Sequence, residues 1–193
     1  LDYESACYAQ LLVALGLKRG ERVVVQIEKS PAALFFYLGC LRAGLIYVPL
    51  NSAYRDLELE HFLDDAEPAL VVCAPERLDA LRVLTTARGI ANVYTLDAAG
   101  RGSLSEAARV CNPRADVEPV DADDIAVILY TSGTTGRPKG AMITHGNLAS
   151  NATTLHQAWG FRDGDVLLHA LPIFHIHGLF VACHTALLNA SSM

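Results

Sequence analysis

Short runs of apolar, often β-branched residues alternate with amphipathic stretches along the first half of the chain. The run from Arg22 to Ile27 is one example, and Ser30 and Pro31 follow it as the expected N-cap and first residue of a helix that ends near Ala43. Parallel strands that are covered on both faces have such continuous apolar runs, and the helices that connect them are amphipathic. The sequence therefore predicts an α/β fold with mostly parallel sheets flanked by helices.

The same pattern predicts the neighbouring elements. Strands are expected at residues 46–48, 69–73 and 92–96, with helices at 56–65 and from residue 75 onward. The run from Ile125 to Tyr130 is apolar on both faces of a strand, so we expect it near the centre of a sheet.

Residues 113–124 break this alternation with two prolines and five acidic residues in twelve positions. A segment of this composition is typical of a linker. The sequence thus predicts a first α/β lobe at residues 1–112, an acidic linker at 113–124 and the start of a second lobe at 125–193.

The charged residues are unevenly distributed. The 15 basic and 21 acidic residues give a net charge of −6, which argues against binding nucleic acid through bulk charge, and none of them lies after Asp165. Histidines interrupt the uncharged segment 166–193, which has no apolar run near the roughly 20 residues of a membrane span. We expect this segment to be buried, with part of its cover further along a longer chain.

The five cysteines are widely spaced and form no CxxC pair, which is typical of a reducing compartment. We therefore expect a cytoplasmic protein. The chain begins with Leu1 rather than Met, so a leader directing it to the mitochondrial matrix is an alternative.

A loop of hydroxyls and glycines follows the apolar run at 125–130. Residues 131–136 are only Thr, Ser and Gly, and Lys139, one of three lysines, comes shortly after. Glycines allow backbone N–H groups to converge on an anion, hydroxyls add donors, and a lysine contributes a point charge. This combination predicts a phosphate-binding loop, although a flexible surface linker has a similar composition.

The loop differs from a Walker P-loop, because Pro138 precedes the lysine and no helix starts directly after it. Residues 141–143 are expected to form a second strand, and Thr144 is the expected N-cap of a helix from His145 to about Trp159. The loop thus bridges two strands, and its hydroxyls replace the helix dipole in binding phosphate.

The segment from Tyr130 to Gly140 resembles the signature of the adenylate-forming enzymes, which include acyl-CoA synthetases, peptide-synthetase adenylation domains and luciferases. The segment from Ala43 to Asn51 is also similar to a stretch of that family. The resemblance implies that the chain is the N-terminal portion of the large domain of such an enzyme, with ATP, Mg²⁺ and coenzyme A as cofactor and co-substrates. It assigns the phosphates to Thr131, Ser132, Gly133, Thr134, Thr135, Gly136, Arg137, Pro138 and Lys139, and a magnesium contact to the Thr134 or Thr131 hydroxyl.

A second segment, 169–178, holds three of the seven histidines. On a strand, His175 and His177 would share a face and form a metal-ligand pair, but no carboxylate completes the site, and buried structural histidines are the simpler interpretation. The segment is also similar to the family's second core motif. That resemblance implies that His175 lies near the activated carboxylate and that Phe174, His177 and Gly178 shape the acyl pocket.

Within the family, residues 171–180 and 146–151 are most similar to malonyl-CoA synthetases. The resemblance implies that a small carboxylate, malonate or methylmalonate, is joined to the phosphate of AMP and then transferred to coenzyme A, with Lys139 and His175 as catalytic residues. Other acyl-CoA or aryl-CoA ligases, a peptide-synthetase adenylation domain, a histidine-based metal hydrolase and a non-catalytic nucleotide-binding module are the alternatives. Further family motifs and the C-terminal lid follow the region matched here, so we expect these 193 residues alone to be inactive.

Overall fold

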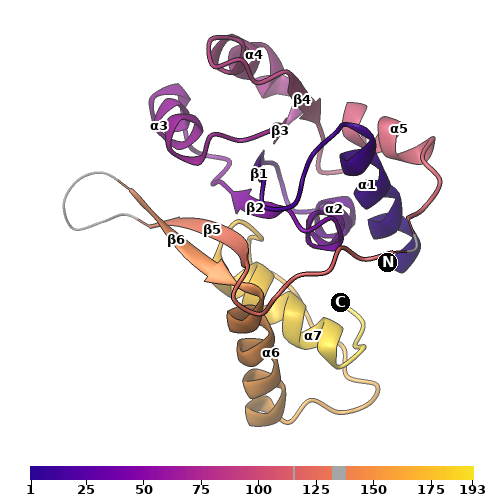
Figure 1. Cartoon of the computed structure of the whole chain (residues 1–193). Coiled ribbons are helices and arrows are strands. Elements are labelled where there is room, and N and C mark those ends of the chain that lie inside the picture. The colour runs from indigo at the N-terminus through magenta and orange to yellow at the C-terminus, as the bar shows by residue number, and fades with distance from the viewer. Residues whose placement is uncertain (115, 132–137) are drawn as a thin grey trace.

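The computed structural model describes residues 1–114, 116–131 and 138–193. Its strands form one six-stranded sheet in the order β4-β3-β1-β2-β5-β6 (Figure 1). The pairs β4-β3, β3-β1, β1-β2 and β2-β5 are parallel, and β5-β6 is antiparallel. The predicted α/β fold with a mostly parallel sheet is therefore confirmed.

The elements follow the predicted alternation. The strands are β1 Arg22–Gln26, β2 Ile46–Pro49, β3 Leu70–Cys73, β4 Asn92–Thr95, β5 Ile125–Thr131 and β6 Lys139–Thr144. The α-helices are α1 Asp2–Ala14, α2 Pro31–Arg42, α3 Asp56–Ala66, α4 Leu78–Thr86, α5 Ser103–Arg109, α6 His145–Trp159 and α7 His184–Leu188. A 3₁₀ turn, η1 Pro75–Arg77, precedes α4, and a π-helix, η2 His177–Cys183, precedes α7.

The predicted helix starts are confirmed in atomic detail. The Ser30 hydroxyl accepts a hydrogen bond from the backbone N–H of Ala33 at 3.1 Å, and Pro31 takes the first helical position of α2. At α6, Thr144 and Asn147 form a reciprocal capping box.

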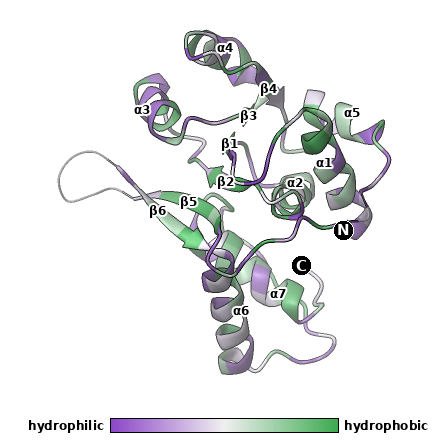
Figure 2. Ribbon diagram, viewed as in Figure 1, coloured by the Kyte–Doolittle hydropathy of each residue, from purple (hydrophilic) through white to green (hydrophobic). Residues whose placement is uncertain are grey.

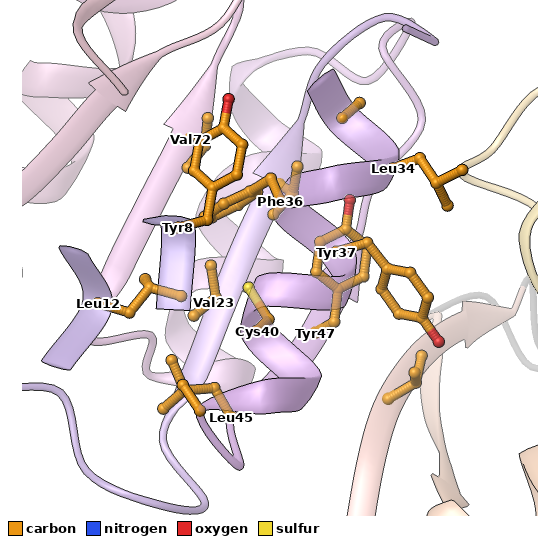
Figure 3. Close-up of a cluster of buried hydrophobic side chains, with 14 of the residues drawn as sticks. Tyr8, Leu12, Val23, Leu34, Phe36, Tyr37, Cys40, Leu45, Tyr47 and Val72 are labelled. Atoms are coloured by element: carbon orange, nitrogen blue, oxygen red, sulfur yellow. The ribbon is translucent and has the colours of Figure 1, made fainter. Parts of the chain in front are cut away.

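Alternate residues of the strands enter two separate cores. Val23 and Val25 of β1 pack with α1, α2 and α5 on one face of the sheet, and Val24 packs with α3 and α4 on the other. Figure 3 shows side chains from α1, β1, α2 and β2 around one another in the first core, among them Tyr8, Leu12, Val23, Phe36, Tyr37 and Tyr47. Both faces of the parallel sheet are thus covered, which explains the continuous apolar runs.

The expectation that residues 125–130 lie at the centre of the sheet is wrong. β5 is second from the edge of the strands that the structure describes, between β2 and β6. It is apolar on both faces because Val127 and Leu129 enter the first core while Ile128 and Tyr130 contact the second. Figure 2 accordingly shows β5 as hydrophobic along much of its length. A strand is buried on both faces when helices cover both sides of the sheet at that strand, and it need not be the central strand.

The acidic segment 113–124 has no helix or strand at its described positions. The backbone N–H of Glu118 donates to the Arg42 carbonyl at 2.8 Å, and the carboxylate of Asp124 pairs with Arg19. β5, after this segment, pairs with β2, before it, through Tyr47 and Val127. The division into lobes at 1–112, 113–124 and 125–193 stays a prediction.

The uncharged segment 166–193 is buried mainly between Gly178 and Ala186. Leu179 and Phe180 in η2 are 0% and 2% exposed, whereas Val166 and Leu168 are 73% and 92% exposed. A cover for these residues further along a longer chain stays a prediction. Among the helices of the described ranges, none has both the length and the apolar character needed to cross a bilayer.

Candidate functional site

A cavity of about 110 Å³ lies where β2 and β5 end, between three segments that are far apart in the sequence. Because these two strands are parallel neighbours, their carboxyl ends meet at one edge of the sheet. The residues around the cavity are Pro49, Asn51, Tyr54, Leu129, Tyr130, Thr131, Phe174, His175 and Ile176. The end of the predicted phosphate loop thus meets the predicted acyl motif at this edge.

The two ends of the predicted phosphate loop lie opposite each other. Thr131, the last residue of β5, is the register partner of Lys139, the first residue of β6. The loop therefore connects two strands, as expected, and the structure shows that these strands are antiparallel. Thr131 lines the cavity, and both of these residues are exposed. Residues 132–137, which include Ser132, Gly133, Thr134, Thr135, Gly136 and Arg137, lie outside the described residues, and so does the expected Thr134 contact to magnesium.

The structure separates the four residues predicted to form the acyl pocket. Phe174 and His175 line the cavity, with their ring centroids 4.5 Å apart. His177 and Gly178 are not among the lining residues, because they begin η2. Gly178 has a packing role, since a Cβ atom there would lie 2.0 Å from the carbonyl oxygen of Pro172.

The strand geometry behind the metal-pair hypothesis is wrong. His175 lies in a bend and His177 in the first turn of η2, so the two residues do not alternate along a strand. In the described ranges, no group of three or more His, Cys, Asp or Glu residues is arranged to hold a metal ion. The hydrolase alternative therefore loses its geometric basis.

Two other histidines of this region have structural partners. His169 Nε2 lies 2.9 Å from the carbonyl oxygen of Gly178. Because a carbonyl oxygen only accepts, Nε2 of His169 carries a proton and donates it in this bond. The Tyr37 hydroxyl lies 2.8 Å from His184 Nε2, and burial lowers the pKa of His184 to about 4. The imidazole of His184 is thus neutral at pH 7, and its Nε2 forms a hydrogen bond with the Tyr37 hydroxyl. The side chains of His169 and His184 are half-buried, whereas His175 and His177 are exposed. The interpretation as buried structural histidines is therefore wrong for His175 and His177.

Sequence reasoning missed a buried amide behind the cavity. Gln26, at the end of β1, is 2% exposed, and its Nε2 donates to the carbonyls of Asn51 at 3.0 Å and Tyr54 at 2.9 Å. Asn51 in turn accepts from the backbone N–H of Ala53 through Oδ1 at 2.9 Å. This segment from Asn51 to Tyr54 forms one wall of the cavity. The polar residue within the apolar run 22–27 was the only sequence signal for it.

Over residues 1–193 the chain matches the family described as AMP-binding enzyme, and it belongs to that family. The loop between β5 and β6 and the cavity at its base are therefore parts of an adenylate-forming fold.

Several members of the family are closely similar to this chain. The solved structure of ATP-bound MatB from Rhodopseudomonas palustris superposes with a TM-score of 0.95 at 50% identity, over 99% of this chain and 38% of that one. A mitochondrial malonate-CoA ligase of Mus musculus is 34% identical over 184 residues, which are 91% of this chain and 30% of the relative. A feruloyl-CoA synthase of an Amycolatopsis species is 33% identical over 193 residues, all of this chain and 37% of the relative. The chain thus spans about a third of the length of the curated relatives it matches.

Proposed function

We propose that this chain supplies the phosphate-binding and acyl-binding part of an ATP-dependent ligase that converts a small carboxylic acid to its CoA thioester. The observation that carries the proposal is a shared cavity. Thr131, the first residue of the predicted phosphate loop, lines it together with Phe174 and His175. The likeness to MatB and to malonate-CoA ligases supports the same activity.

The reaction has two steps. A carboxylate oxygen attacks the α-phosphorus of ATP, and the bond to pyrophosphate breaks to leave an acyl adenylate. The thiol of coenzyme A then attacks the acyl carbon, AMP leaves, and the thiol proton passes to solvent. The first step brings two anions together, so alignment and charge compensation are the main tasks of the protein.

The described residues divide these tasks between two sides of the site. Lys139, at the start of β6, provides a cation for the β- and γ-phosphates, and the Thr131 hydroxyl opposite it adds a donor. His175 lies on the side of the acid, where its ring orients the carboxylate, and Phe174 bounds the space for the acyl group. These residues would hold the two substrates in line.

Mg²⁺ is part of the proposal. The hydroxyl of Thr131 is an oxygen donor, the ligand type that this ion prefers, and Thr134 is the second candidate from the same loop. The ion would supply charge neutralisation at the phosphate oxygens.

We propose malonate or methylmalonate as the acid. The likeness to MatB and to two malonate-CoA ligases supports a short acid over an aryl or long-chain one. A second carboxylate requires a hydrogen-bond donor, and the imidazole N–H of His175 in the cavity lining is one.

A reducing compartment is also part of the proposal. All five cysteines are free thiols, and burial raises the pKa of Cys73 and Cys183 to about 11, which keeps both protonated. The cytoplasm and the mitochondrial matrix both meet this condition, and the Mus musculus relative is mitochondrial.

Acid-dependent exchange of labelled pyrophosphate into ATP by the natural full-length protein tests the function. The panel contains malonate, methylmalonate, acetate, benzoate, ferulate and the twenty amino acids. We expect exchange with malonate or methylmalonate and formation of the CoA thioester. Exchange with amino acids alone would identify a peptide-synthetase adenylation domain, and ATP binding without exchange would identify a non-catalytic module.

Two variants test the assignment of the loop. We expect Lys139→Ala to weaken ATP binding or pyrophosphate release, and Thr134→Val to slow adenylation more than thioester formation. Unchanged exchange in both variants would overturn the assignment.

A further inference from the structure

Helix α3 contacts both stems of the hairpin that carries the predicted phosphate loop. On the β5 stem, the Tyr130 hydroxyl donates to Asp65 Oδ2 at 2.6 Å. On the other stem, His61 Nε2 lies 3.1 Å from the Pro138 carbonyl oxygen. His61 and Asp65 are four residues apart on α3, so they project from the same face of the helix toward the hairpin.

The direction of each bond is fixed by its acceptor. A carbonyl oxygen cannot donate, so Nε2 of His61 carries the proton in its bond to Pro138. The carboxylate of Asp65 accepts from Tyr130, and burial together with this bond raises the pKa of that phenol above its ordinary value. Both stems therefore have a defined donor and acceptor pair with α3.

An aromatic contact lies on the same helix. The ring of Phe62, which is 0% exposed, lies 4.5 Å from the ring of Tyr130 and 5.0 Å from the ring of Tyr54 between centroids. Tyr54 belongs to the wall of the cavity, and α3 begins directly after that wall at Asp56. One helix thus contacts the acyl side of the site and both stems of the phosphate side.

The bond from His61 is important because β6 has a neighbour on one side only. Among the described strands, β6 lies at the edge of the sheet and pairs with β5 alone. Its first residue, Lys139, directly follows Pro138, whose carbonyl is the one that His61 contacts. The position of Lys139 relative to the cavity therefore depends on β5 and on α3.

We propose that His61 and Asp65 are positioning residues that set the places of Lys139 and Thr131 relative to the acyl cavity. The proposal rests on the proposed function, because it assumes that these two residues bind ATP phosphates. Neither His61 nor Asp65 is among the described residues that line the cavity. They keep the phosphates in line with the acid, so their loss should weaken the binding of ATP more than the binding of the acid.

Two matched pairs of variants test the proposal in the natural full-length protein. His61→Leu removes the donor to Pro138, and His61→Gln keeps an N–H donor of similar reach. Asp65→Ala removes the acceptor for Tyr130, and Asp65→Asn keeps an acceptor oxygen. The readouts are the KM for ATP and the KM for the acid in pyrophosphate exchange.

We expect His61→Leu and Asp65→Ala each to raise the KM for ATP about three- to tenfold, as the loss of one hydrogen bond does. The KM for the acid should change less than twofold, and His61→Gln and Asp65→Asn should stay near the wild type. An unchanged KM for ATP in both removal variants would overturn the proposal. An equal rise in both KM values would also overturn it, since general destabilisation acts on both substrates.

Hydrogen exchange at the backbone amides of Lys139 and Gly140 separates this proposal from the proposed function. We expect these amides to exchange about three- to tenfold faster in His61→Leu than in His61→Gln. If the wild type shows no pyrophosphate exchange with any acid of the panel, the proposed function fails. The amide exchange rates of Lys139 and Gly140 would still show whether α3 fixes the β6 stem. Equal rates in the two variants would overturn that role.

Discussion

Gln26 offers the sharpest test of how the cavity wall is held. Its side chain is buried, and its Nε2 donates to the carbonyls of Asn51 and Tyr54 at 3.0 and 2.9 Å. Gln26→Leu keeps a similar volume but removes both donors. The segment from Asn51 to Tyr54, which carries two of the cavity residues, then has no side-chain bond to β1 from this position.

The magnitude follows from the bonds that are lost. A buried acceptor without a donor costs about 1–3 kcal/mol. In Gln26→Leu the Tyr54 carbonyl loses this donor, whereas the Asn51 carbonyl keeps its bond from the Tyr54 backbone N–H. The substitution also removes Oε1 of Gln26, a buried atom with no hydrogen-bond partner among the described residues. Removing this atom stabilises the variant and offsets part of the lost free energy. We expect the free energy of opening of the segment to fall by about 1–3 kcal/mol.

Hydrogen exchange at Tyr54 measures this opening directly. Its backbone N–H donates to the Asn51 carbonyl at 3.1 Å, so it exchanges only when the segment opens. We expect exchange about 5- to 150-fold faster in Gln26→Leu, since each 1.4 kcal/mol is a factor of ten. The amides of α4, on the other part of the sheet, serve as the internal control and should keep their wild-type rates.

Gln26→Glu adds a control with almost the same shape. An ionised carboxylate has no donor for the two carbonyls, whereas a protonated one has a single O–H. Burial raises the pKa of this carboxyl in the folded state, so the variant should be more stable at low pH and lose stability as the pH rises. Wild-type exchange at Tyr54 in both variants would refute the argument that the amide of Gln26 holds the wall.

Three further predictions concern packing and pH. Gly178→Ala should raise the KM for the acid and cost more than about 2 kcal/mol in unfolding experiments, since its Cβ would lie 2.0 Å from the carbonyl oxygen of Pro172. Gly39→Ala, whose Cβ would lie 2.6 Å from Cβ of Tyr8 where α1 crosses α2, should lower the urea midpoint by an amount that corresponds to about 1–3 kcal/mol. His184 has a pKa of about 4 in the folded state and 6.5 otherwise. Its contribution to stability is therefore full above pH 6.5 and lost as the pH falls toward 4, by at most about 3 kcal/mol. Thermal unfolding from pH 7 to 4 should show this loss in the wild type and not in His184→Phe.

The sheet could be predicted from the sequence because burial on both faces leaves a clear pattern. The run at 69–73 became β3 at Leu70–Cys73, and the Thr144 cap fixed the start of α6. Helix α1 was not predicted, since its buried residues include the consecutive stretch from Ser5 to Ala9. A helix covered by both α2 and α5 has no single apolar stripe, so helical periodicity is absent.

The candidate site was only partly predictable, for a related reason. The loop at 131–139 and the pair Phe174 and His175 are visible as local motifs, because glycine, hydroxyl and aromatic residues gather within a few positions. The hydrogen bonds that hold the wall join residues 25 and 28 positions apart, and the bond from His61 to Pro138 spans 77. Contacts over such separations depend on strand order, which one sequence does not specify.

The distribution of charge around the cavity fits the chemistry proposed for it. No Lys, Arg, Asp or Glu is among the described residues that line the cavity, and Lys139 lies at the hairpin opposite Thr131. A carboxylate in direct contact with a lysine would be stabilised before the reaction and would be a poorer nucleophile. Negative charge increases on the departing pyrophosphate in the transition state, so a cation there lowers the barrier more than one beside the acid. In the proposed reaction, an acid site of neutral donors and a phosphate site with a lysine would therefore place the positive charge where it lowers the barrier to adenylation.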